Sequence, residues 1–207
     1  MTKIKLCGLS RDQDIFYANR LMPDYAGFVF CEKSSRSVTR RQAFLLREKL
    51  HPSIKAVGVF VDETEETIRS LTVAGIIQLI QLHGGETEEE IRRLREILDP
   101  QVKIIRAFRT DSAEDVVKAQ KSAADLVLVD HGPGGTGQRF DWKLLAPLNR
   151  PFILAGGLHA GNAAEAVRTL KPYAVDVSSG IETDGKKDFE KMEAFCRAVR
   201  TADMTGL

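Results

Sequence analysis

A lysine, a cysteine and an aspartate within two apolar segments of this 207-residue sequence could serve as a base and an acid. Lys5 and Cys7 alternate with apolar residues, so on a β-strand both side chains point to one face, where an ammonium favours the thiolate. Asp130 follows Leu126 and Leu128 in the same alternation. Cys7 is therefore a candidate base or nucleophile, and Asp130 a candidate acid. A cysteine packed as a small apolar residue and an aspartate capping the next turn are the alternatives.

Two segments rich in glycine and serine could bind an anion. Gly156 and Gly157 follow one short apolar segment, and Ser178, Ser179 and Gly180 follow the next. Residues of these types let backbone amides approach a phosphate group. No P-loop lysine pattern accompanies them, which favours a sugar phosphate over a nucleoside triphosphate. Two tight turns with no ligand are the alternative interpretation.

Arg36, within the serine-rich segment 34–37, could hold a carboxylate through two parallel hydrogen bonds, or it could simply face solvent. His83 is a candidate for the same site, or it forms a local hydrogen bond. The four histidines and three cysteines show no metal-ligand spacing and no CxxC pair, so we expect no metal site and no disulfide. The glycine-rich segment 132–137 could close over a ligand as a lid.

Short β-branched and apolar segments recur along the whole chain and must position these side chains. Their starts lie about 24 residues apart, close to the minimum length of a βα unit. The expected strands are Ile4–Cys7, Tyr25–Phe30, Ile54–Phe60, Ile76–Leu82, Val102–Phe108, Leu126–Asp130, Phe152–Ala155 and Tyr173–Ser178. Segments with helical spacing lie between them. The expected helices are Asp12–Leu21, Thr39–Leu50, Glu63–Leu71, Glu86–Leu98, Ser112–Ser122, Asn162–Leu170 and Asp188–Val199, with a weaker segment at Trp142–Leu148.

The strict alternation of strand and helix predicts an α/β protein with a parallel sheet. No GxGxxG follows the first strand, and eight strands is the number that closes a barrel filled by its own side chains. We therefore predict a single-domain (β/α)8 TIM barrel over residues 1–207, with a frayed tail at 201–207. In such a barrel the chemistry lies at the carboxyl ends of the strands.

The composition excludes several classes of protein. Lys plus Arg number 30 and Asp plus Glu 29, a formal net charge of +1, so no basic surplus exists for nucleic acid or an anionic membrane surface. No segment reaches the roughly 18 apolar residues of a membrane span, and the N-terminus has no signal-peptide pattern. The scattered cysteines fit a reducing compartment. We expect a cytoplasmic protein that acts on a small molecule.

Six blocks of the sequence resemble phosphoribosylanthranilate isomerases, in the order that the family has them. They are KLCGL at 5–9, VGVFV at 57–61, QLHG at 81–84, GGTGxxFDW at 134–142, LAGGL at 154–158 and DVSSGIE at 176–182. The resemblance implies a compact barrel that needs no cofactor or metal and occurs as a monomer or a homodimer. It implies an aldose–ketose isomerase of tryptophan biosynthesis, which converts N-(5-phosphoribosyl)anthranilate to 1-(2-carboxyphenylamino)-1-deoxyribulose 5-phosphate.

The resemblance also implies a role for each candidate residue. Cys7 corresponds to the general base, with a modestly lowered pKa, and Asp130 to the general acid, which opens the sugar ring. Arg36 corresponds to the arginine for the anthranilate carboxylate. The phosphate cradle corresponds to the backbone around Gly156, Gly157, Ser178, Ser179 and Gly180. The chain departs from the family in lacking the proline that often precedes this arginine, and in placing His131 after the acid.

Two related barrel enzymes and one non-enzyme are the alternatives. Indole-glycerol-phosphate synthase would have a catalytic lysine and glutamate, and the Amadori isomerase of histidine biosynthesis would have an aspartate at the end of the first strand. This chain has Cys7 there. A receptor for a phosphorylated ligand would keep the two anion-binding segments but would have no use for both Cys7 and Asp130.

Overall fold

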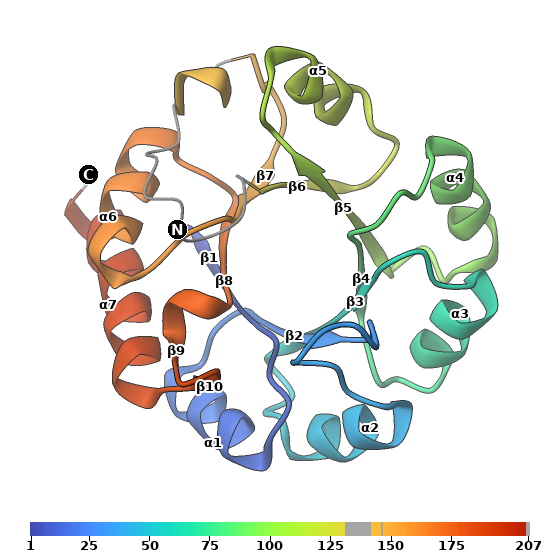
Figure 1. Cartoon of the computed structure of the whole chain (residues 1–207), viewed down its shortest axis with the longest axis horizontal. Helices are drawn as coiled ribbons and strands as arrows, with labels where there is room; N and C mark the ends of the chain where they lie inside the picture. The colour runs from blue at the N-terminus through green and yellow to red at the C-terminus, as the bar shows by residue number, and fades with distance from the viewer. Residues whose placement is uncertain (131–141, 146, 206–207) are drawn as a thin grey trace.

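Eight parallel strands form a closed barrel in the order of the chain, as Figure 1 shows in a view along the barrel. The computed structural model describes residues 1–130, 142–145 and 147–205. The strands are β1 (Lys3–Cys7), β2 (Tyr25–Val29), β3 (Lys55–Phe60), β4 (Leu79–Leu82), β5 (Lys103–Arg109), β6 (Leu126–Asp130), β7 (Phe152–Leu154) and β8 (Ala174–Val177). The predicted (β/α)8 fold is confirmed.

The helices surround the barrel (Figure 1). They are α1 (Asp12–Leu21), α2 (Arg40–Lys49), α3 (Glu65–Val73), α4 (Glu88–Ile97), α5 (Ala113–Lys121), α6 (Ala160–Leu170) and α7 (Phe189–Thr205), with short 3₁₀ helices η1 (Trp142–Leu145) and η2 (Ser179–Ile181). Four helices begin after a hydroxyl residue whose oxygen accepts a hydrogen bond from a backbone amide of the first turn. These N-caps are Thr39, Thr64, Thr87 and Ser112.

Two apolar layers hold the barrel together. The larger layer lies between the strands and the surrounding helices and includes Phe28, Phe60 and Phe195, all fully buried. The smaller layer fills the inside of the barrel, where Val57, Ile105 and other strand residues meet. Because strand side chains alternate between the two layers, a polar residue in the inward series must lie inside the barrel.

The C-terminal segment differs from the sequence-based expectation. Residues 201–207 were expected to fray; of these, 201–205 belong to α7, and 206–207 lie outside the described residues. Ala202 is buried, and the carboxylate of Asp203 accepts hydrogen bonds from both the backbone N–H and the hydroxyl of Thr2, at 2.6 and 2.9 Å. These contacts tie the last helix to the start of β1 and account for the helical conformation as far as Thr205.

A small hairpin follows β8 and was not predicted. Its strands β9 (Glu182–Thr183) and β10 (Lys186–Lys187) are antiparallel and are joined by Asp184 and Gly185, whose φ angles are 50° and 72°. Two left-handed residues in a two-residue loop form the turn that suits a hairpin's twist, and Asp-Gly is a favoured sequence for it. The hairpin turns Lys187 back beneath the end of β8.

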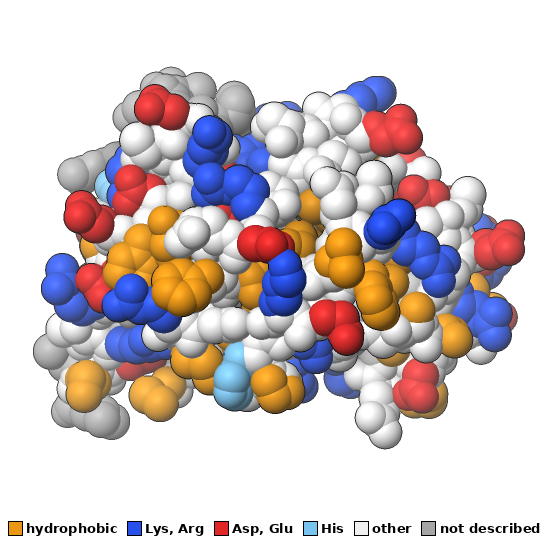
Figure 2. Space-filling model, turned by 90° about the horizontal axis from the view of Figure 1, so that it is seen from below, with side chains coloured by type: hydrophobic (Ala, Val, Ile, Leu, Met, Phe, Trp, Pro, Cys, Tyr) orange, Lys and Arg blue, Asp and Glu red, His pale blue; other side chains and the backbone are white. Residues whose placement is uncertain are grey.

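The outer surface seen in Figure 2 carries both signs of charge, interspersed with apolar side chains. This face has no large region of a single charge, as the formal net charge of +1 leads one to expect. No helix in the described part of the chain is long and apolar enough to cross a membrane.

Candidate active site

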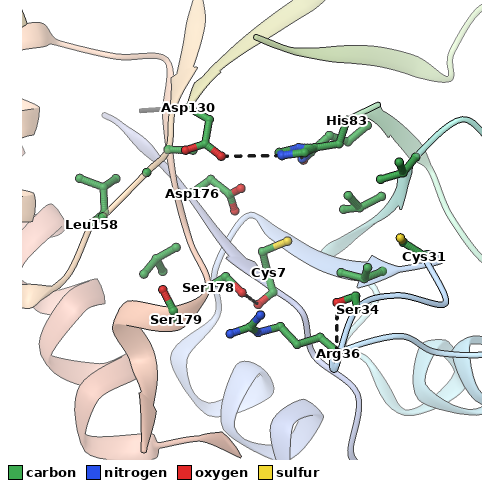
Figure 3. A pocket seen from close by; sticks show the side chains of 18 residues that line it. Cys7, Cys31, Ser34, Arg36, His83, Asp130, Leu158, Asp176, Ser178 and Ser179 are labelled. Atoms are coloured by element: carbon green, nitrogen blue, oxygen red, sulfur yellow. Dashed lines mark hydrogen bonds and ion pairs between the residues drawn. The ribbon is translucent and has the colours of Figure 1, made fainter. Parts of the chain in front are cut away.

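A cavity of about 340 Å³ opens at the carboxyl ends of the strands (Figure 3). Residues far apart in the sequence meet here because all eight parallel strands end at the same rim. Of the predicted site residues, only Gly180 is not part of the lining. The cavity is lined by Cys7, Arg36, His83, Asp130, Gly156, Gly157, Ser178 and Ser179, together with residues that sequence reasoning did not select.

The Cys7 thiol lies at the end of β1 and is only 7% exposed. Its neighbour on β2 is Gly27, and a β-carbon added to Gly27 would lie 2.7 Å from the Cys7 sulfur. Glycine at this position therefore makes room for the thiol. The backbone carbonyl of Cys7 accepts a hydrogen bond of 3.1 Å from the Ser178 hydroxyl, which connects β1 to the loop after β8 (Figure 3).

A buried ion pair lies directly below Cys7. Lys5 is fully buried, and its Nζ is 2.9 Å from Oδ1 of Asp176, its register partner on β8. Burial alone would lower the pKa of Lys5, but the charge of Asp176 and the Cys7 sulfur raise it overall. Lys5 is therefore charged, and it stands on the inward face, as the alternation predicted.

The pKa of Cys7 is raised, so the expectation of a lowered pKa is wrong for the protein by itself. The largest cause is burial, which disfavours the thiolate. The Lys5 ammonium lowers the pKa of Cys7, but the Asp176 charge raises it and partly cancels this effect. Lys187 also lowers the pKa, but the two lysines together do not offset burial and Asp176. Sequence reasoning counted the lysine but not the carboxylate that faces it.

Asp130 and His83 face each other across one side of the cavity (Figure 3). Oδ2 of Asp130 is 3.7 Å from Nε2 of His83, and Nδ1 of His83 is 2.9 Å from the amide nitrogen of Gln81. Gln81 is 1% exposed, and within the described residues its Oε1 has no hydrogen-bond partner. His131 and the predicted lid at 132–137 lie outside the described residues.

Arg36 forms an ion pair with Glu182 and does not simply face solvent. Its Nε and Nη2 donate to the two carboxylate oxygens of Glu182 at 2.7 and 2.6 Å. This hydrogen bonding raises the pKa of Arg36. Burial would raise the pKa of Glu182, but Arg36 and Lys187 hold it below its ordinary value, so Glu182 is a carboxylate.

The two predicted anion-binding loops lie against each other. Gly156 and Gly157 have φ angles of 86° and 60°, a conformation that favours glycine. A β-carbon on Gly180 would lie 1.9 Å from the Leu158 carbonyl oxygen, so only glycine permits this close contact. Within the described residues, no protein acceptor takes the backbone N–H of Gly157, Ser179 or Gly180. Such amides are suited to an anion.

Several residues of the site were not selected from the sequence. Asp176 carried a recognisable signal, because it precedes Ser178 in the inward series of β8. Lys187 and Glu182 reach the site through the hairpin, for which the Asp-Gly pair was the available signal. Cys31 also lines the cavity and is partly exposed. No group of three or more possible metal ligands occurs in the part of the chain that the structure describes.

The fold and the site together define a (β/α)8 barrel with titratable side chains and two anion-suited loops at its catalytic rim. The family model described as N-(5'phosphoribosyl)anthranilate (PRA) isomerase matches residues 4–198. N-(5'-phosphoribosyl)anthranilate isomerase from Thermoanaerobacter sp. (strain X514) is 43% identical over 206 residues, covering 97% of this chain and 98% of the relative. The chain belongs to the N-(5'-phosphoribosyl)anthranilate isomerase family, a family of isomerases.

Two solved structures are similar over nearly the whole chain. One is a phosphoribosyl anthranilate isomerase in complex with reduced 1-(o-carboxyphenylamino)-1-deoxyribulose 5-phosphate, with a TM-score of 0.83, 32% identity, and coverage of 97% of this chain and 100% of that one. The other holds monomers of the dimeric isomerase from Thermotoga maritima, also with a TM-score of 0.83, 32% identity, and coverage of 97% and 100%.

Proposed function

We propose that this chain catalyses the Amadori rearrangement of N-(5-phosphoribosyl)anthranilate to 1-(2-carboxyphenylamino)-1-deoxyribulose 5-phosphate, a step of tryptophan biosynthesis. The observation that carries the proposal is that Cys7 and Asp130 line one cavity together with Arg36 and the loops after β7 and β8. One cavity thus holds a potential acid, a potential base and subsites for two anions. Membership of the isomerase family supports the same reaction.

The substrate's two anionic groups match the two ends of this cavity. The phosphate would accept hydrogen bonds from the amides of Gly157, Ser179 and Gly180, for which the described part of the chain supplies no acceptor. The carboxylate of the anthranilate ring would bind the edge of Arg36 that Glu182 leaves open. Held at both ends, the ribose would lie between Cys7 and Asp130, and this positioning contributes to the rate.

Asp130 acts first in the proposed mechanism. It donates its proton to the ring oxygen of the ribose as the bond from C1 to that oxygen breaks, which leaves an open chain with a protonated Schiff base at C1. Cys7 then takes the proton from C2, giving an enolamine. Loss of the C2 hydroxyl proton and gain of a proton at C1 produce the ketone. The atoms balance without any further reactant, and each acid or base contributes typically 10² to 10⁴ in rate.

The raised pKa of Cys7 is compatible with this order of steps. In the protein by itself, burial keeps the thiol protonated. The Schiff base brings a positive charge next to the sulfur, and a nearby cation lowers the pKa of a thiol. The thiol then releases its proton to solvent and, as a thiolate, accepts the proton from C2, which restores the thiol. Asp130, left as a carboxylate by ring opening, takes up a proton from solvent, so the protons balance over the whole reaction.

A fluorescence assay tests the proposal, since the emission of the anthranilate group should fall as the substrate rearranges. A flat trace with the wild-type protein would reject the reaction. Cys7→Ala and Asp130→Asn should each slow turnover by about 10² to 10⁴. Cys196→Ala is the control, because Cys196 is buried in α7, outside the cavity. Wild-type rates in both site variants would contradict the assigned roles.

A further inference from the structure

We propose that Glu182 and Lys187 are positioning residues that fix Arg36 and the loop after β8 relative to each other, so that the site selects ligands by the spacing of their two anionic groups. The inference rests on the proposed function, because it takes Arg36 and this loop as the carboxylate and phosphate subsites. Neither Glu182 nor Lys187 lines the cavity, so both would act through the groups they hold.

Glu182 fixes the orientation of the Arg36 guanidinium. Its two oxygens accept from Nε and Nη2 at 2.7 and 2.6 Å, and two parallel bonds stop the planar group from rotating. The Glu182 side chain is 7% exposed and that of Arg36 is 29% exposed. Within the described residues, Nη1 makes no hydrogen bond to the protein. Glu182 therefore leaves one edge of Arg36 available for a carboxylate in the cavity.

Gly8 allows Arg36 to occupy this place. It follows Cys7 with a φ of 75°, and a β-carbon there would lie 2.6 Å from Cδ of Arg36. The stem of Arg36 thus packs directly on the backbone of the loop after β1. Figure 3 shows the guanidinium beside Cys7 and Ser178, at the lower side of the cavity.

Lys187 connects Glu182 to the loop after β8. Its Nζ donates to Oε1 of Glu182 at 2.6 Å and to the backbone carbonyl of Ser178 at 3.0 Å, and its side chain is 1% exposed. Ser178 immediately precedes η2, whose amides are proposed to bind phosphate. A continuous chain of hydrogen bonds therefore runs from Arg36 through Glu182 and Lys187 to the phosphate loop.

The charges of this chain suit a ligand with two anionic groups. Burial lowers the pKa of Lys187, and Glu182 partly offsets that effect. With Arg36 and Lys187 positive and Glu182 negative, the sum is 2 − 1, or one net positive charge beside the two subsites. A full second positive charge would bind a single anion more tightly without regard to its shape. The negative charge of Glu182 weakens that attraction, but its hydrogen bonds fix the positions of the groups that bind the ligand.

Glu182→Gln tests the positioning of Arg36. Glutamine has nearly the same shape, but its NH₂ group must replace one of the two oxygens. Each of these oxygens accepts from Arg36, and Oε1 also accepts from Lys187, so at least one Arg36 donor loses its acceptor. We expect KM to rise about tenfold, the effect of losing one charged hydrogen bond, while kcat stays within about threefold. The inhibition constant of inorganic phosphate should stay within about twofold, because Lys187 still holds Ser178.

Lys187→Met should have a different signature. It removes the donor to the Ser178 carbonyl but leaves the Arg36 and Glu182 pair intact, so both KM and the inhibition constant of phosphate should rise several-fold, by roughly the effect of one hydrogen bond. Two variants at exposed positions serve as matched controls. Lys186→Met lies on the same hairpin, and Glu190→Gln lies in the first turn of α7, which follows it. Both controls should keep wild-type kinetic constants.

A double variant keeps the proposal testable if the single variants are less stable. In an Arg36→Met background, Glu182→Gln should raise KM no further, because Glu182 is proposed to affect the ligand's carboxylate through Arg36. Additive effects, or a uniform loss of kcat, KM and phosphate affinity that follows the melting temperature, would show a merely structural role. An unchanged KM in Glu182→Gln would also overturn the proposal.

Direct binding separates this proposal from the proposed function. Calorimetry with 2-aminobenzoate and with inorganic phosphate needs no turnover. If Glu182→Gln weakens only 2-aminobenzoate binding and Lys187→Met weakens phosphate binding, the positioning roles stand even where the fluorescence assay shows no isomerisation. If both ligands bind the variants as they bind the wild-type protein, the positioning roles fail even where isomerisation is observed.

Discussion

Lys3 and Lys5 lie two residues apart on the same face of β1, but the two ends of the barrel give them different surroundings. At the amino end, the Nζ of Lys3 is 3.4 Å from the hydroxyl of Tyr25 and 4.9 Å from the ring centroid of Tyr173. The two tyrosine hydroxyls are themselves 3.1 Å apart. At the catalytic end, Lys5 is paired with the Asp176 carboxylate, and its side chain is fully buried.

The difference shows that the neighbouring strands decide what a lysine does in this barrel. The amino end pairs its lysine with neutral aromatic side chains, which close the barrel beneath the apolar interior. The catalytic end pairs its lysine with a carboxylate that also lines the cavity. An ionised pair is expensive to bury, so its location below the reacting groups favours a role in the site over a role in stability.

The largest expected effect is on stability. Lys5→Met leaves the Asp176 charge without its partner in a nearly closed interior, which should cost about 3–5 kcal/mol of unfolding free energy. Lys3→Met removes contacts of a partly exposed ammonium with two rings, and should cost about 1 kcal/mol or less. Urea unfolding measures both. If both variants lost the same unfolding free energy, the two lysines would not differ in their contribution to stability, contrary to this comparison.

A smaller effect is expected in the alkaline range at the amino end. Burial, together with the Tyr173 hydroxyl, raises the pKa of Tyr25 to about 12 from an ordinary value of 10.0. Because the folded value is the higher one, the neutral phenol stabilises the folded protein below pH 10, and this contribution is lost as the pH rises to about 12. Tyr25→Phe should flatten the fall of unfolding free energy over this range. A tyrosinate absorbance step near pH 10 for Tyr25 would contradict the raised pKa.

The smallest expected effect concerns thiols at the catalytic end. Cys7 is buried with a raised pKa, whereas Cys31 on the same cavity is partly exposed. Iodoacetamide should therefore modify Cys31 faster than Cys7 near neutral pH, by roughly threefold or more, and Cys7 should gain reactivity as the pH rises. Mass spectrometry of the labelled peptides measures both rates. Faster labelling of Cys7 at neutral pH would mean that its thiolate is more accessible than the structure shows.

The fold could be predicted from the sequence because its signal is local and repeated. The helices were expected from their apolar spacing, and the starts expected at Thr39 and Glu86 lie within one residue of the N-caps Thr39 and Thr87. The start of α6 was placed two residues late, since its N-cap is His159, an unusual capping residue. The first residues of the strand expected at Ile76–Leu82 are a buried connection, and β4 begins only at Leu79. Apolar residues alone do not separate a strand from the segment that leads into it.

The sequence by itself determined which side chains reach the rim, because the alternation along a strand fixes the face on which Cys7 and Asp130 lie. Only the tertiary structure decided their electrostatics. Asp176 faces Lys5 through a strand pairing between residues 171 positions apart, and the hairpin places Glu182 against both Lys187 and Arg36. The direction of a pKa shift depends on burial and on the nearest charges in space, and neither quantity is a property of a local segment.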